Sequence, residues 1–93
     1  MNRRRFEHLI LEVSLAVGKT VPRYRLWLRL HDLGWNPEEL ACKEVLAFCD
    51  DGLAIFLAEL GLKLAPRDAR RVRKAIARFD PEVLSPYERV STG

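Results

Sequence analysis

The chain has 93 residues, of which 48% are hydrophobic and 31% charged, and its formal net charge is +3 at pH 7. This length suits one domain with a single modest core and is too short for a core together with a deep substrate cleft. The composition argues against intrinsic disorder, and no apolar run approaches the roughly 18 residues that a transmembrane helix needs.

Apolar residues recur at helical spacing along the chain, and no stretch shows the alternation typical of a half-buried strand. A first helix is predicted over residues 3–17, ended by Gly18. Its predicted core face consists of Phe6, Leu9, Ile10, Val13, Ala16 and Val17. Pro22 favours the first position of a second helix, which ends at Gly34. The predicted core stripe of this helix is Leu26, Leu30 and Leu33.

A third helix is predicted from Asn36 to about Phe48. Asn36 can cap its N-terminus, Pro37 fits its first turn, and Glu39 stands at the capping-box position. These three signals together predict one continuous helix.

Asp50 and Asp51 are expected to cap a fourth helix, which ends at Gly61. Its apolar residues are Leu53, Phe56, Leu57 and Leu60. A fifth helix is predicted from Pro66 to Phe79, and residues 85–88 repeat the helix-start pattern and predict a last short turn. The predicted fold is therefore an all-α, compact single-domain bundle of five or six short helices over residues 1–93, with frayed ends at about 1–3 and 90–93.

The basic start of the chain, followed by apolar residues, resembles a signal peptide, but Glu7 and Glu12 interrupt the apolar region. Cys42 and Cys49 are predicted on one helix, about 10 Å apart along its axis, which is too far for a disulfide. We interpret them as reduced, buried thiols, and we expect a cytoplasmic protein.

Amide side chains are scarce, since Gln is absent and Asn stands only at positions 2 and 36. Arg is also more frequent than Lys. This composition is typical of thermophile proteins, although a GC-rich genome would also favour Arg.

Residues that carry catalysis or bind metals are sparse. His8 and His31 are the only histidines, and the sequence has no His-x-x-x-His, no Cys-x-x-Cys and no Gly-rich phosphate loop. Cys49 and His31 could act as nucleophile and base, but a structural thiol and a surface imidazole explain them more simply. Asp50 and Asp51 look like a carboxylate pair, for which helix capping is the simpler interpretation. We therefore expect no catalytic residues, metal ligands, cofactor or enzymatic activity.

Five cations share one stripe of the predicted fifth helix, within about 100° of arc. They are Arg67, Arg70, Arg71, Lys74 and Arg78. Segment 62–79 carries seven basic residues and one acidic residue, a net charge of +6. Such a face indicates binding to nucleic acid or to an acidic protein surface, or is a solvated helix face. Against nucleic acid, no aromatic residue interleaves the stripe, and residues 36–60 carry six acidic residues against one basic.

The first two predicted helices carry apolar residues on a second side. Leu11 and Leu15, with His8 above them, lie away from the core face of the first helix. On the second helix the corresponding residues are Tyr24, Trp27, Leu28 and His31. Such helices are either sandwiched inside the fold or meet a partner. The predicted apolar interface is Leu11, Leu15, Tyr24, Trp27 and Leu28, used for self-association as a two-fold dimer.

Several short motifs follow one another between residues 27 and 79. They are Trp27-Leu28 before Leu33-Gly34, Asp51-Gly52-Leu53, Leu60-Gly61-Leu62, and a long last helix with Arg70-Arg71-Val72 and Ala75-Ile76. This order resembles sterile alpha motif (SAM) domains, which are five-helix interaction modules, although the long first helix departs from that pattern. The step into the Arg-rich helix also looks like a helix-hairpin-helix DNA-binding unit, but residues 65–68 stand where that unit has a Gly-rich hairpin.

The resemblance implies a SAM-like or orthogonal bundle that acts as a binding module. SAM-like domains can associate head to tail through an acidic middle surface and the basic start of the last helix. The acidic counter-surface that this implies is Glu38, Glu44, Asp50 and Asp51. The sequence thus predicts a protein–protein interaction module that associates as a homodimer or head to tail and does not bind membranes. The alternative hypothesis is a nucleic-acid-binding protein that uses the Arg-rich fifth helix, and the third hypothesis is an enzyme.

Overall fold

The computed structural model describes residues 3–79 of the chain. Within this range there are five α-helices, one short 3-10 helix and no strand, which confirms the predicted all-α bundle. The elements are α1 (Arg4–Val17), α2 (Arg23–Asp32), η1 (Pro37–Glu39), α3 (Cys42–Asp51), α4 (Leu53–Glu59) and α5 (Pro66–Arg78). None of the helices in the described range is long and apolar enough to cross a membrane.

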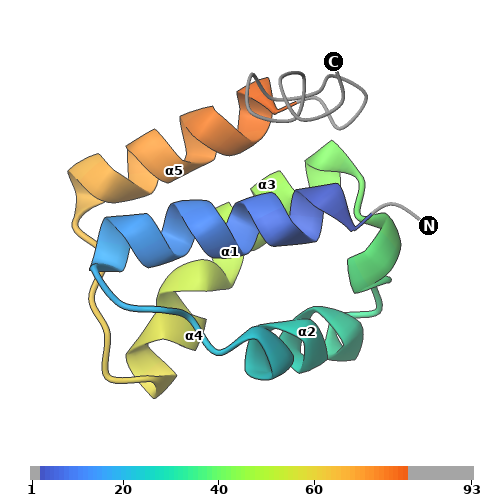
Figure 1. Cartoon of the computed structure of the whole chain (residues 1–93), viewed down its shortest axis with the longest axis horizontal. Helices are drawn as coiled ribbons and strands as arrows, with labels where there is room; N and C mark the ends of the chain where they lie inside the picture. The colour runs from blue at the N-terminus through green and yellow to red at the C-terminus, as the bar shows by residue number, and fades with distance from the viewer. Residues whose placement is uncertain (1–2, 80–93) are drawn as a thin grey trace, which may run out of the picture.

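The helix α1 occupies the middle of the bundle. It crosses in front of α3, with α5 along one side of it and α2 on the other (Figure 1). Contacts join α1 to α5, α3 and η1, and α3 contacts both α4 and α5. The core that they enclose consists of Phe6, Leu9, Val13, Val21, Leu26, Leu30, Leu40, Val45, Phe48, Leu53, Phe56, Leu57, Val72 and Ile76. Because these side chains come from every α-helix, no helix can leave the bundle without exposing apolar area.

The first helix has the predicted extent and core face. Phe6, Leu9 and Val13 are buried, since they recur at helical spacing on one side. Gly18 ends the helix in the left-handed conformation with φ of 76°. The hydroxyl of Ser14 then accepts a hydrogen bond from the Val21 backbone N–H at 3.0 Å, which holds the loop that leads to α2.

The prediction of one continuous helix from Asn36 to Phe48 is wrong. Asn36 does cap the start, because its Oδ1 accepts a hydrogen bond from Glu38 N at 3.0 Å. The 3-10 helix η1 nevertheless ends at Glu39, and extended backbone at Leu40 and Ala41 separates it from α3. The physical reason is burial, since the extended conformation directs Leu40 into the core. The cap of α3 comes from Glu44 rather than from Glu39, through a 2.9 Å hydrogen bond from Ala41 N to Glu44 Oε1.

The prediction that Asp50 and Asp51 cap the fourth helix is also wrong. Both residues belong to the last turn of α3, and Gly52 alone separates α3 from α4. A Cβ atom at residue 52 would lie 3.0 Å from Phe48 Cδ1, so a larger residue there would require the Phe48 ring to shift by a few tenths of an ångström. The chain turns at Gly52, beside the buried Phe48 ring.

The structure differs from the sequence prediction in two details at the ends of α2. Pro22 precedes the first helical residue rather than occupying it. Leu33 is 49% exposed rather than buried, because α2 ends at Asp32 and the chain turns away through Gly34, whose φ is 90°. The short turn predicted at residues 85–88 lies outside the described residues.

The position of Leu9 generates a stability prediction. Leu9 is fully buried, whereas Leu11 on the same helix is 54% exposed. The Leu9→Ala variant is expected to lose about 2–5 kcal/mol of unfolding free energy through lost burial and a residual cavity. The Leu11→Ala control is expected to lose less than about 1 kcal/mol. Urea unfolding followed by circular dichroism measures both, and equal losses would contradict the assignment of the core.

Candidate functional site

An open groove of about 330 Å³ lies between the first half of α1, the helix α2 and η1. Its lining residues are Arg3, Phe6, Glu7, Arg23, Tyr24, Trp27 and Glu38. Phe6 is buried and Trp27 half-buried, and the indole of Trp27 stacks on the His31 ring with centroids 5.2 Å apart. The groove therefore combines an apolar aromatic part with charged groups.

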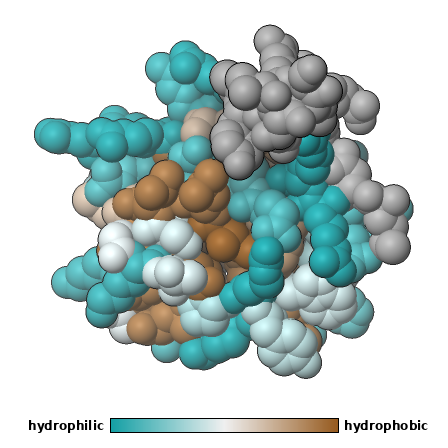
Figure 2. All heavy atoms as spheres, viewed as in Figure 1, coloured by the Kyte–Doolittle hydropathy of each residue, from teal (hydrophilic) through white to brown (hydrophobic). Residues whose placement is uncertain are grey.

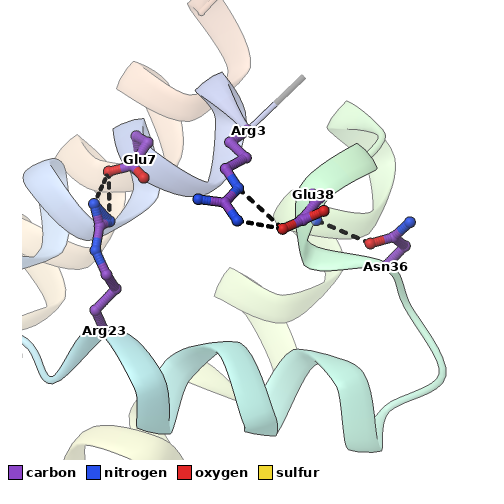
Figure 3. A network of polar contacts seen from close by, with 5 residues as sticks. All are labelled: Arg3, Glu7, Arg23, Asn36 and Glu38. Carbon is purple, nitrogen blue, oxygen red and sulfur yellow. Dashed lines mark hydrogen bonds and ion pairs between the residues drawn. The ribbon is translucent and has the colours of Figure 1, made fainter. Parts of the chain in front are cut away.

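The charged groups of the groove are paired with one another. The guanidinium of Arg23 donates two hydrogen bonds to Glu7 Oε2, at 2.6 and 2.5 Å, and so joins α2 to α1 (Figure 3). Arg3 donates from Nε and Nη2 to Glu38 Oε1, at 3.0 and 2.5 Å, and so joins the start of α1 to η1. Because each carboxylate already faces an arginine, the groove suits an uncharged group better than acid–base chemistry.

The predicted apolar interface divides into two strips. Leu11 and Leu15, 54% and 69% exposed, lie one turn apart on the outer face of α1 and form what we term the α1 strip. Figure 2 shows hydrophobic residues gathered over α1 in the middle of this face. Tyr24 and Leu28 form the α2 strip and are 71% and 37% exposed. Trp27, by contrast, is half-buried in the groove and belongs to neither strip.

His8 does not extend the α1 strip as expected. Its ring stacks on Phe79 at the end of α5, with centroids 4.2 Å apart and planes 7° from parallel. Its Nε2 lies 3.3 Å from Glu12 Oε1, and its Nδ1 is buried without a hydrogen-bond partner in the described structure. Desolvation lowers the pKa of His8, although the neighbouring Glu12 carboxylate acts in the opposite direction. The imidazole thus serves the packing of α1 on α5.

The five predicted basic residues of α5 share one solvent-facing side. We term Arg67, Arg70, Arg71, Lys74 and Arg78 the α5 basic face, and all five are exposed. Val72 and Ile76 are buried on the opposite side of the helix. Arg73, which flanks the face, turns toward α3 and donates from Nε to Asp50 Oδ1 at 2.8 Å.

The predicted acidic counter-surface is divided among several roles. Glu38 pairs with Arg3, and Glu44 caps α3. Asp50 accepts hydrogen bonds from Arg73, which lower the pKa of the Asp50 carboxyl. Asp51 is exposed at the end of α3. Three of these carboxylates thus have partners inside the molecule.

The thiols and the histidines lie on different elements of the described structure. Cys42 and Cys49 are both free and lie on α3, whereas His31 lies on α2 against Trp27. Burial, assisted by the charge of Asp50, raises the pKa of Cys49 to about 11. Residues 3–79 contain no group of three or more His, Cys, Asp or Glu side chains arranged to hold a metal ion.

Sequence reasoning missed the groove. Its two ion pairs join residues 16 and 35 positions apart, so no spacing rule could connect them. The only signal in the sequence was the abundance of Arg and Glu, which allows many pairings.

Comparison of the chain with family models, with curated proteins and with solved structures found no match. The resemblance to SAM domains therefore stays a prediction from short motifs.

The environment of Cys49 generates a prediction about thiol reactivity. In a Cys42→Ala variant, Cys49 is the remaining thiol of the chain. With its pKa raised from 9.0 to about 11, Cys49 should hold about 100-fold fewer thiolates near pH 8 than an ordinary thiol. Its reaction with a disulfide reagent is expected to be slower by that order in the folded protein than in concentrated urea. Equal rates would contradict this and revive the nucleophile interpretation.

The environment of His8 generates a prediction about pH. Because the folded-state pKa is lowered, the unfolded chain binds the proton more readily, so stability is expected to fall as pH drops below 6.5. The His8→Phe variant keeps a ring against Phe79 but cannot titrate. Unfolding free energies at about pH 7.5 and about pH 5.5 should therefore differ less for this variant than for the wild type. Identical pH dependence of the two proteins would refute the prediction.

Proposed function

We propose that the protein is a protein–protein interaction module that self-associates as a two-fold dimer through the α1 strip. The observation that carries the proposal is the exposure of Leu11 and Leu15 on a helix whose opposite face is already buried. Leucines in such a position gain free energy when a second apolar surface covers them.

A second copy of the chain fits this strip better than an unrelated partner does. Leu11 and Leu15 are four residues apart on one helix, so the strip matches itself when a second copy is turned end to end. If two α1 helices packed antiparallel about a two-fold axis, Leu11 of one copy would face Leu15 of the other.

The head-to-tail assembly implied by the SAM resemblance receives less support. Glu38, Glu44 and Asp50 would have to exchange existing partners for cations of another copy. Exposed ion pairs contribute only about 0–1 kcal/mol each, so such an exchange offers little net gain. An apolar contact needs no exchange of partners.

The dimer is expected to be weak, because two leucines per copy make a contact smaller than the roughly 1,600 Å² of a standard interface. Sedimentation equilibrium measures the dissociation constant of the dimer. Chain concentrations between about 10 μM and about 1 mM bracket the range expected for weak association. The Leu11→Glu, Leu15→Glu variant is expected to remain monomeric. Ile55 on α4 is 58% exposed, and the Ile55→Glu control is expected to associate like the wild type.

The salt dependence of association distinguishes the two-fold dimer from the head-to-tail assembly. The apolar dimer should persist between about 50 mM and about 500 mM salt, because screening acts on charges rather than on apolar burial. Assemblies larger than a dimer that dissociate at high salt would favour the head-to-tail contact instead. A wild-type protein that stays monomeric at the highest concentration would overturn the proposal.

A further inference from the structure

The outer face of α5 is a surface of positive charge that the proposed dimer does not use. The buried Val72 and Ile76 face the core, and α5 packs against α1 and α3, so the opposite side of the helix is presented to solvent (Figure 1). Arg67 and Arg78 are eleven residues apart, and the basic face therefore runs for about 16 Å along the helix axis. Asp68 is the only acidic residue of α5.

Within residues 3–79, these charges are not compensated by ion pairs. Four arginines outside the α5 basic face each pair with a carboxylate: Arg3 with Glu38, Arg23 with Glu7, Arg29 with Glu59, and Arg73 with Asp50. Within the described range, no residue of the α5 basic face forms an ion pair. The contrast is sharpest on α5 itself, where the flanking Arg73 is paired and the five outward residues are not. Their guanidinium and ammonium donors are therefore available to an external anion.

The chemistry of the face favours phosphates over a protein partner. Protein interfaces usually contain an apolar or aromatic centre that excludes water from the polar contacts. The large hydrophobic residues exposed in the described structure lie on α1, α2 and α4 and in the turn after α2, and none lies on α5. A phosphate backbone needs no such centre, because its affinity comes from cations and released counterions.

The face also favours a duplex over a single strand. Proteins that bind single strands stack the bases on aromatic side chains. Phe79, the aromatic residue at the end of α5, is stacked on His8 and lies apart from the basic face. A duplex carries about ten backbone charges over 16 Å, at one charge per roughly 1.7 Å of axis. Five cations along α5 thus meet a dense, matching row of anions.

From these observations we infer that the α5 basic face binds the phosphate backbone of duplex nucleic acid without reading its base sequence. The shared chemistry is the phosphate backbone, so DNA and RNA duplexes are separate arms of the test. With five phosphate contacts, the logarithm of the binding constant should fall with the logarithm of salt concentration with a slope of about −4.5. The inference is independent of the α1 strip and of the dimer.

Fluorescence anisotropy tests the inference by measuring the affinity of the full chain for labelled duplexes. Duplexes of about 20 base pairs are longer than the α5 basic face. The double variant Arg70→Ala, Arg71→Ala removes two cations of the face. It is expected to lower the affinity at least tenfold near about 100 mM salt and to reduce the slope by about 2. The matched control Arg25→Ala, Lys43→Ala removes the same charge from exposed positions on α2 and α3 and should keep the wild-type slope.

Binding of either duplex that weakens only in the α5 variant supports the inference, and the arm that binds identifies the nucleic acid. Equal weakening in the control variant would show attraction by net charge alone and would overturn it. It would also be overturned if neither duplex bound at about 50 mM salt, where counterion release is large. Binding to anionic vesicles without binding to either duplex would likewise reject it, in favour of a lipid surface.

Discussion

Burial of the inner face of α1 is the constraint on which the other surfaces of this protein depend. Phe6, Leu9 and Val13 fix the rotation of the helix about its axis, because they must face the core. Once that rotation is fixed, geometry directs each remaining side of α1. One side carries His8 to Phe79 on α5, another carries Glu7 to Arg23 on α2, and the side away from the core carries Leu11 outward.

The same rotation of α1 explains why Leu11 and Leu15 are exposed. The neighbours of α1 cover its core face and its flanks, so an apolar residue on its outer face has no partner in the described part of the chain. Exposure of single apolar residues is ordinary on protein surfaces. Two exposed leucines one helical turn apart can, by contrast, pack against the same pair on a second copy turned by a two-fold axis.

Pairing of arginines with carboxylates decides where positive charge remains available. The four arginine–carboxylate pairs named above join residues distant in the sequence, from 16 to 35 positions apart, and each links two parts of the bundle. Individually such exposed pairs contribute about 0–1 kcal/mol. Their larger effect is on the surface field, since they neutralise the groove and the end of α3 and leave the cations of α5 as a one-signed surface.

Local sequence rules predicted the helices well where the signal was local. The 3.6-residue spacing and Gly18 defined α1, and Pro66 together with the spacing of Val72 and Ile76 defined α5 and its basic face. The same rules failed between Asn36 and Gly52. There the burial of Leu40 interrupts the helix, and contact with Phe48 places the turn at a glycine. Capping signals could not reveal either contact, because both depend on where the core lies.

The sequence by itself thus determined the helical class, the apolar face of each long helix and the stripe of cations on the last one, because these follow from periodicity along the chain. The tertiary structure alone decided which charges are neutralised, that His8 serves packing, and that a groove forms beside Trp27. Those features join residues that are far apart in sequence, and only burial of a common core brings them together.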